Sequence, residues 1–238
     1  MAVTSTPSAL WGEGRAEGPS WVEGPPVVPV LTLHRERDAV PLAEALVAGG
    51  IDVLEVTLRT PVALRCIEAI AKALPRASVG AGTIVSAADA RAARDAGARF
   101  AVSPGWRPEV AAACRGVGLA LLPGVATASE TMAATADGYR FLKFFPAAAA
   151  GGVPMLEALA GPFPDVVFCP TGGITLASAP AYLALPNVRL VGGSWLAPRD
   201  AIETGDWKRI AALAREAAQL RDRQQPDATG GMVSRDSR

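Results

Sequence analysis

A short strand-like run followed by a helical pattern repeats eight times along this chain, and this alternation constrains the fold more than any other feature. The runs are rich in β-branched residues, and they begin near residues 27, 51, 78, 98, 118, 139, 166 and 188. Successive starts lie 20 to 27 residues apart, which is the length that one strand, one helix and two short loops need. Eight such units predict an α/β fold, a (β/α)8 TIM barrel that forms a single domain.

The segments between the runs have the composition of helices. They are rich in Ala, Leu, Arg and Glu and carry apolar residues at helical spacing. The clearest helical patterns cover Ala39–Ala48 and residues 61–73, 87–96, 108–115 and 201–220.

A doubly wound open sheet is the alternative architecture. It usually carries a glycine-rich nucleotide-binding turn after its first strand. Here the first strand-like run is followed by Leu33-His34-Arg35-Glu36, which contains no glycine. The barrel is therefore favoured, and its chemistry is expected where the strands end and the βα loops begin.

The barrel does not need the whole chain of 238 residues. Residues 1–26 are rich in Gly and Pro and predict a mobile N-terminal arm. Residues 222–238 are polar and predict a disordered C-terminal tail. The barrel domain is expected to span residues 27–221.

Charge and residue counts exclude several function classes. The chain has 23 basic and 23 acidic side chains, so no charge excess favours nucleic acid or an anionic membrane as a partner. The N-terminus lacks the basic start and apolar block of a signal peptide, and we expect a soluble, cytoplasmic protein. There is one histidine, and the three cysteines are at least 48 residues apart, so we predict no zinc site, whereas a magnesium ion held by carboxylates stays open at this point.

Lys143 is the first candidate for chemistry. It is one of only three lysines, and it lies in the strand-like segment Tyr139-Arg-Phe-Leu-Lys143-Phe-Phe145-Pro. Alternation places Tyr139, Phe141, Lys143 and Phe145 on one face, which would point into the barrel. Aromatic neighbours solvate an ammonium poorly, which favours the neutral amine that attacks a ketone to form a Schiff base. A lysine that simply extends into solvent is the alternative interpretation.

Glu55 and Arg59 are the second candidates. Alternation places Ile51, Val53, Glu55, Thr57 and Arg59 on one face of another strand-like segment, so both charged groups can reach the mouth of the barrel. Glu55 could move protons, and the Arg59 guanidinium matches a carboxylate. A purely structural ion pair, between these two or with Lys143, is equally consistent with the pattern.

Glycine-rich turns follow the last two strand-like runs. They are Pro170-Thr-Gly172-Gly173-Ile174 and Gly192-Gly193-Ser194-Trp195. Such turns direct backbone N–H groups toward an anion, and TIM barrels often bind phosphate in the loops after strands 7 and 8. We therefore predict that these two turns form a phosphate site, the alternative being tight turns without a ligand.

Two further turns place small or hydroxyl residues at strand ends. Gly80-Ala-Gly-Thr83 follows the third run, and Ser103-Pro104-Gly105 follows the fourth. These residues could line a pocket for a small acid, or they could be ordinary βα turns. The cysteines are expected to be buried as small apolar residues.

Two long segments resemble the signature segments of a known family. Gly50-Ile-Asp-Val-Leu-Glu55-Val-Thr-Leu-Arg59 and Gly138-Tyr-Arg-Phe-Leu-Lys143-Phe-Phe-Pro-Ala147 are similar to those of the KDPG/KHG aldolases. These are class I aldolases that act on 2-keto-3-deoxy-6-phosphogluconate (KDPG) and 4-hydroxy-2-oxoglutarate (KHG). The shorter turns resemble the family too, so the resemblance covers about residues 27–220.

The resemblance implies a role for each candidate. In the family pattern Lys143 would be the Schiff-base lysine and Glu55 the general acid/base. Arg59 and Thr83 would hold the carboxylate, whereas Gly172, Gly173 and Ser194 would bind the phosphate. Pro104 and Phe145 are also expected at the substrate. The family is a homotrimeric (β/α)8 barrel that needs no metal, which implies a small 2-keto acid substrate, no cofactor, and cleavage of KDPG to pyruvate and glyceraldehyde 3-phosphate.

Several alternatives stay open at this stage. The preferred substrate could be KHG, which yields pyruvate and glyoxylate, or 2-keto-3-deoxy-6-phosphogalactonate. A phosphosugar isomerase or epimerase could use the same barrel without an imine. A non-catalytic barrel could bind phosphorylated acids and release no pyruvate, and a pyridoxal phosphate enzyme would also use a lysine and phosphate loops.

Overall fold

The structure is a computed structural model that describes residues 24–220 of the chain. Most of the predicted arm (residues 1–23) and the whole predicted tail (residues 222–238) lie outside the described residues, so both stay predictions.

A strand begins at or within three residues of every start predicted from the sequence. The strands are β1 (Val27–Leu31), β2 (Val53–Thr57), β3 (Ser78–Gly82), β4 (Phe100–Val102), β5 (Ala120–Leu122), β6 (Gly124–Val125), β7 (Phe141–Phe144), β8 (Val167–Pro170) and β9 (Val191–Gly193). The strand pairs are parallel, as expected when a helix connects each strand to the next.

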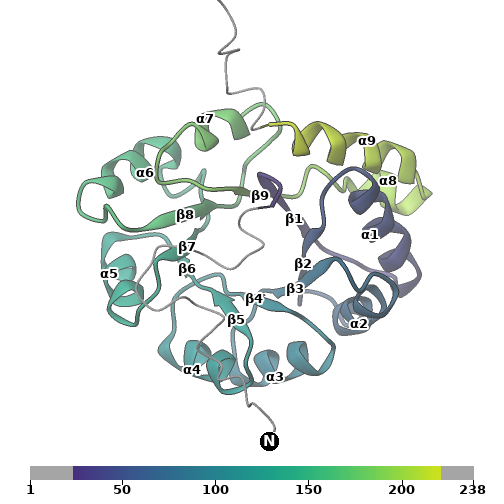
Figure 1. The fold of residues 1–238 in the computed structure, drawn as a ribbon, viewed down its shortest axis with the longest axis horizontal. Coiled ribbons are helices and arrows are strands. Elements are labelled where there is room, and N and C mark those ends of the chain that lie inside the picture. Colours follow the sequence, from purple (N-terminus) through teal and green to yellow (C-terminus); the bar gives the residue numbers. More distant parts are fainter. Residues whose placement is uncertain (1–23, 221–238) are drawn as a thin grey trace, which may run out of the picture.

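The strands form two hydrogen-bonded sheets. One sheet has the order β5-β4-β3-β2-β1-β9, and the other has the order β6-β7-β8. β5 and β6 are separated only by Pro123, which has no N–H to donate to a ladder but accepts a hydrogen bond from Lys143 N at 2.9 Å. The result is an α/β fold with a curled parallel sheet, and Figure 1 shows the strands around the centre with the helices outside them.

The helices match the predicted patterns, with one exception. They are α1 (Ala39–Ala48), α2 (Ala63–Ala73), α3 (Ala87–Asp95), α4 (Pro108–Gly116), α5 (Ala128–Ala136), α6 (Gly152–Ala160), α7 (Ala179–Leu183), α8 (Arg199–Thr204) and α9 (Trp207–Ala218), with a short 3-10 helix at Glu36–Asp38. The single helix predicted for residues 201–220 is wrong. Gly205 adopts φ +72° and ends α8, and the Asp206 side chain then caps α9 by accepting from Arg209 N.

Buried side chains form two separate clusters on the two faces of the strands. The larger cluster joins the strands to the helices and includes Leu54 and Phe144. The smaller one consists of residues in or next to the strands and includes Val53 and Phe141. These lie two residues before Glu55 and Lys143 and therefore share a strand face with them. The two predicted candidates are thus on the face that turns away from the helices.

Alternation fails just before each of these two strands. Ile51 and Tyr139, which the pattern predicts on the inner faces, belong to the larger outer cluster. Both precede the first residue of their strand, so the two-residue period of the strand does not apply to them. Tyr139 instead packs edge-on against Trp106, with ring centroids 5.3 Å apart.

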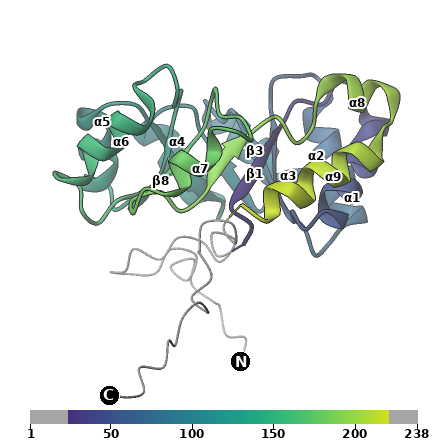
Figure 2. The ribbon, with the colours of Figure 1, turned by 90° about the horizontal axis from the view of Figure 1, so that it is seen from above.

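Figure 2 shows the ring of helices from its edge, with α5 and α6 on one side and α1, α8 and α9 on the other. Within residues 24–220 no helix combines the length and the apolar character that a membrane span requires.

Candidate active site

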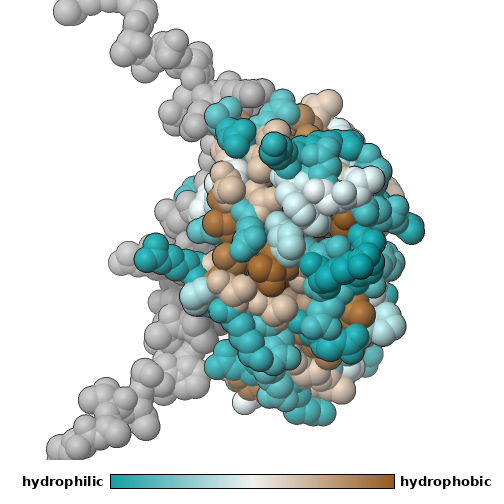
Figure 3. Space-filling view, turned by 90° about the vertical axis from the view of Figure 1, so that its right-hand side faces the viewer, coloured by the Kyte–Doolittle hydropathy of each residue, from teal (hydrophilic) through white to brown (hydrophobic). Residues whose placement is uncertain are grey.

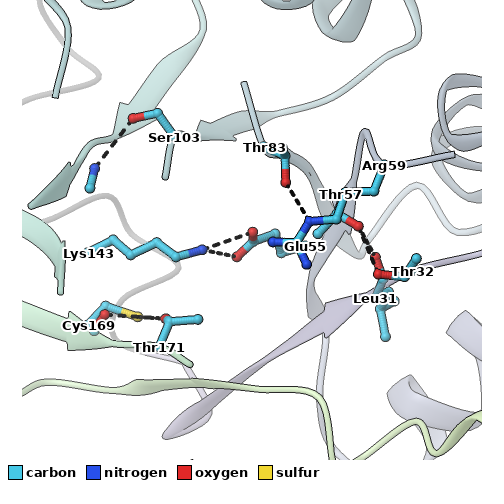
Figure 4. Close-up of polar contacts among 11 residues, drawn as sticks. Leu31, Thr32, Glu55, Thr57, Arg59, Thr83, Ser103, Lys143, Cys169 and Thr171 are labelled. Carbon is cyan, nitrogen blue, oxygen red and sulfur yellow. Dashed lines mark hydrogen bonds and ion pairs between the residues drawn. The ribbon is translucent and has the colours of Figure 1, made fainter. Parts of the chain in front are cut away.

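Lys143 and Glu55 meet in the interior although they are 88 residues apart in sequence. Lys143 extends from β7 and Glu55 from β2, and Nζ lies 3.2 Å from Oε1 and 3.5 Å from Oε2 (Figure 4). The two side chains are only 5% and 4% exposed. The expected interior position of both is confirmed, and the lysine does not extend into solvent.

This buried pair can hold or exchange a proton. Two charges taken out of water are costly unless each neutralises the other. Transfer of one proton from the ammonium to the carboxylate removes both charges and leaves a neutral amine beside a carboxylic acid. The centroid of the Phe145 ring lies 5.4 Å from Lys143 Nζ, so an aromatic ring forms one wall of the site. The pair therefore combines a potential nucleophile with a group that can take and return its proton.

The carboxylate of Glu55 occupies the space that a side chain at position 82 of β3 would fill. A Cβ built on Gly82 would lie 2.2 Å from Glu55 Oε1, far inside van der Waals contact. Glu55 and Gly82 lie close because their strands are neighbours, with Glu55 in register with Gly80. The absence of a side chain at position 82 thus permits the carboxylate to take its place beside Lys143.

Arg59 and Thr83 form a second polar pair at the mouth of the strands. Arg59 Nε donates to Thr83 Oγ1 at 3.1 Å (Figure 4), which orients the guanidinium and leaves its two Nη groups as further donors. Thr83 is the only non-glycine residue among those described with a positive φ, at 63°. Such backbone strain is concentrated at functional sites.

A cavity of about 260 Å³ opens above these groups. Six of the candidate residues line it, namely Arg59, Lys143, Phe145, Gly172, Gly173 and Ser194. Gly172 and Gly173 have φ of +101° and +75°, a conformation that residues with a side chain rarely adopt. The turn is therefore built to bring its backbone close to whatever occupies the cavity.

The role of Pro104 at the substrate stays a prediction. Like Glu55 and Thr83, Pro104 is not among the residues that line this cavity. Its backbone packs against Gly124, where a Cβ would meet the Pro104 carbonyl at 2.4 Å, and Gly124 is paired with Lys143 across β6 and β7. Pro104 is thus one strand removed from the lysine.

Sequence reasoning missed two hydroxyl residues of the site, Thr32 and Thr171, which both line the cavity. Each directly follows the last residue of a strand, β1 or β8, and ligands of parallel α/β sheets bind at the carboxyl ends of the strands. That position was the available signal. Thr32, Val30 and Ser194 also line a second, larger cavity of about 640 Å³, so the two spaces adjoin.

Cys169 lies next to Lys143 in the ladder between β7 and β8. It is a free, buried thiol. Burial raises its pKa to about 12, although the neighbouring Lys143 opposes this shift. The thiol therefore stays protonated and unreactive at neutral pH, as expected for a small apolar core residue. Within the described part of the chain, no three His, Cys, Asp or Glu side chains are grouped so that they could hold a metal ion.

Comparison with known proteins decides the family. The family model described as KDPG and KHG aldolase matches residues 20–213. The chain is 54% identical over 192 residues to the 2-dehydro-3-deoxy-phosphogluconate aldolase of Pseudoalteromonas atlantica, a match that covers 81% of this chain and 89% of that protein. The chain belongs to the KDPG and KHG aldolase family. It is therefore an aldolase, a carbon–carbon lyase.

Other relatives of this aldolase support the same family assignment. It is 53% identical over 195 residues to the KHG/KDPG aldolase of Escherichia coli, covering 82% of this chain and 91% of that one. Among solved structures it is similar to a KDPG aldolase from Legionella pneumophila, with a TM-score of 0.81 and 46% identity over 90% of this chain and 98% of that chain. That structure holds pyruvate as a covalent carbinolamine intermediate.

Proposed function

We propose that this aldolase cleaves KDPG to pyruvate and glyceraldehyde 3-phosphate through a Schiff base on Lys143. The observation that carries the proposal is the buried contact of 3.2 Å between Lys143 Nζ and Glu55 Oε1, beside a cavity that Lys143 itself lines. The carbinolamine in the Legionella pneumophila relative supports the covalent route.

The reaction starts with attack on the keto carbon. The neutral amine of Lys143 adds to C2, a C–N bond forms, and the keto oxygen takes up a proton to give a carbinolamine. Glu55 takes the proton from the nitrogen and returns one to the departing oxygen, so that water leaves and a protonated imine remains. One carboxyl group can serve both steps because each proton that it accepts is given back.

The protonated imine then draws electrons from the C3–C4 bond. Glu55 removes the proton of the C4 hydroxyl, the C3–C4 bond breaks, and its electron pair forms the enamine of pyruvate. Glyceraldehyde 3-phosphate leaves as the aldehyde. Protonation at C3 by Glu55 and addition of water to the imine release pyruvate and restore the amine.

The two ends of the substrate would be held by the other predicted residues. Arg59, oriented by Thr83, is proposed to bind the carboxylate, because a guanidinium pairs well with two oxygens. Gly172, Gly173 and Ser194 are proposed to bind the phosphate through backbone N–H groups and a hydroxyl. Phe145 would form a wall of the site beside the imine.

Trapping with borohydride tests the proposal. Reduction of a pyruvate imine adds hydride to its carbon and leaves a carboxyethyl group on the lysine nitrogen. We expect this adduct on Lys143 after treatment with pyruvate and borohydride, located by peptide mass spectrometry. An isomerase, an epimerase or a non-catalytic binding protein would give no adduct, and that result would overturn the proposal.

A second measurement separates the candidate substrates. KDPG, its galactonate epimer and KHG differ in one hydroxyl configuration or in the phosphate tail. We expect the highest kcat/KM with KDPG, measured as pyruvate release. A higher value with either other compound would assign the enzyme to that substrate.

The phosphate site gives a testable prediction. Ser194→Ala removes one hydroxyl, and hydrogen bonds to charged groups contribute about 1.5–3 kcal/mol. We expect kcat/KM for KDPG to fall by about 10- to 100-fold, whereas kcat/KM for KHG, which has no phosphate, should change little. An equal loss on both substrates would contradict a phosphate-binding role.

Gly82 gives a prediction about positioning. In Gly82→Ala the new Cβ would collide with Glu55 Oε1, so the carboxylate must move away from Lys143. We expect pyruvate release to fall by about 100-fold, because displacements of about 1 Å can have this effect. Gly116→Ala is the matched control, since apart from its chain neighbours and the backbone of its own helix no atom lies within 4 Å of its Cβ position. Similar losses in both variants would show that Gly82 has no special relation to Glu55.

The closed barrel, the homotrimer and the cytoplasmic location are also proposals. We infer that β5 and β6 act as one strand and that the sheet closes into an eight-stranded barrel. The isolated bridges Phe168–Val188 and Thr171–Gly192 support closure between β8 and β9. The homotrimer rests on the family resemblance. On the face that carries α1, α8 and α9, hydrophobic residues gather near the middle of a mainly hydrophilic surface (Figure 3), and such a patch could be a subunit contact.

A further inference from the structure

Thr32 occupies a special position in the site, directly after β1. It lines the cavity of Lys143 and also the larger cavity beside it. Thr32 is exposed, yet its Oγ1 lies within hydrogen-bonding distance of Thr57 Oγ1, at 3.0 Å (Figure 4). Thr57 is fully buried, so this contact fixes Thr32 to the wall of the strands.

Counting protons determines the direction of these hydrogen bonds. Thr57 Oγ1 contacts the Leu31 carbonyl oxygen at 2.9 Å, and a carbonyl can only accept. The single hydroxyl proton of Thr57 is therefore donated to Leu31. For the contact with Thr32 to be a hydrogen bond as well, Thr32 must be the donor. Its proton is then committed to Thr57, and its oxygen offers only lone pairs to the cavity.

An acceptor at this place would select a substrate group that donates. In the proposed function C2 lies at Lys143, the C4 oxygen must reach Glu55, and the phosphate lies at Ser194. The C5 hydroxyl of KDPG falls between these points, and Thr32 and Ser194 line the same two cavities. KHG has a carboxylate at C5, whose oxygens can only accept.

We propose that Thr32 is a specificity-determining residue that accepts a hydrogen bond from the C5 hydroxyl of the substrate and disfavours a carboxylate there. The inference rests on the proposed function and deepens it, because it names a group that distinguishes KDPG from KHG. The hydrogen bond from the C5 hydroxyl strengthens the binding of KDPG. The Thr32 oxygen facing a carboxylate oxygen, with no proton between them, weakens the binding of KHG.

The test compares two substrates on two variants of Thr32. Thr32→Val keeps the branched shape and removes the oxygen, whereas Thr32→Ser keeps the oxygen. We expect the ratio of kcat/KM for KDPG to that for KHG to fall by about tenfold in Thr32→Val and to stay near the wild-type ratio in Thr32→Ser. An unchanged ratio in the valine variant, or an equal fall in both variants, would overturn the proposal.

Thr60→Val is the matched control. Thr60 donates its hydroxyl to the Leu33 carbonyl at 2.6 Å, so it also ties the segment after β1 to the segment after β2, but it lines neither of the two cavities. We expect its variant to keep the substrate ratio of the wild type. A fall equal to that of Thr32→Val would assign the effect to the loop and not to the acceptor.

A test on the substrate side does not depend on how the variants fold. In the synthesis direction the enzyme joins pyruvate to an aldehyde, and the C2 hydroxyl of glyceraldehyde 3-phosphate becomes the C5 hydroxyl of KDPG. The analogue 3-oxopropyl phosphate lacks this hydroxyl. We expect the wild-type enzyme to prefer glyceraldehyde 3-phosphate by about tenfold, and no preference would overturn the role of Thr32. If the wild-type enzyme released pyruvate from neither KDPG nor KHG, the proposed function would be refuted instead.

Discussion

Replacing Lys143 by arginine is expected to abolish both pyruvate release and trapping by borohydride. A guanidinium keeps a positive charge near Glu55 but cannot form the imine. The loss should be about 10⁴-fold or more, on the scale seen when an enzyme loses its nucleophile. Pyruvate release in a coupled assay and the mass of the reduced adduct measure the two effects.

The choice of arginine rather than alanine follows from burial. Glu55 is 3% exposed, and removing one partner of a buried ion pair costs about 3–5 kcal/mol. Lys143→Ala could therefore lose activity through unfolding. Arginine keeps the charge balance, and thermal unfolding of the variant should confirm that it is folded.

Lys72→Arg is the matched control. Lys72 also pairs with a glutamate, Glu68, but its side chain is 74% exposed on α2. We expect its variant to keep full activity and the borohydride adduct. If Lys143→Arg kept most of its activity and the adduct formed on another lysine, the covalent role of Lys143 would be refuted.

The alternating strands and helices of this parallel α/β fold could be predicted from the sequence because the signals are local and repeated. Each strand needed only a short, mostly apolar run, and each helix needed only apolar residues at helical spacing. The break between α8 and α9 was missed because a single glycine inside a helical pattern is a weak signal. Gly205 followed by Asp206 combines a helix end with a helix start, and this pair was the available cue.

The site could be predicted only in part. Lys143 and Glu55 were recognisable because charged residues are rare in apolar strands, and burying them is costly without a partner. The position of Thr32 directly after β1 was only a weak signal, since threonine is common in strands and after them. Its significance depends on Thr57, which lies 25 residues away, and on the shape of a cavity. For Pro104 the pattern predicts only a position at a strand end, because it says nothing of how that turn packs against Gly124.

Glu55→Gln is expected to leave a slow enzyme rather than an inactive one. The amide has the shape of the carboxylate and can still accept a hydrogen bond from Lys143 Nζ, but it cannot take up a proton. General acid/base groups contribute about 10²–10⁴-fold to rate, so kcat should fall within that range. Because the amine is still present, prolonged incubation with pyruvate and borohydride should still give the adduct on Lys143.

This combination of results separates the two roles. Lys143→Arg should lose the adduct and the activity together, whereas Glu55→Gln should lose activity and keep the adduct at the end point. Glu68→Gln is the matched control, because Glu68 also pairs with a lysine but is exposed on α2. If Glu55→Gln kept more than half of the wild-type kcat, the proton transfers would have to be assigned to another group, and the contact of 3.2 Å would be a structural ion pair.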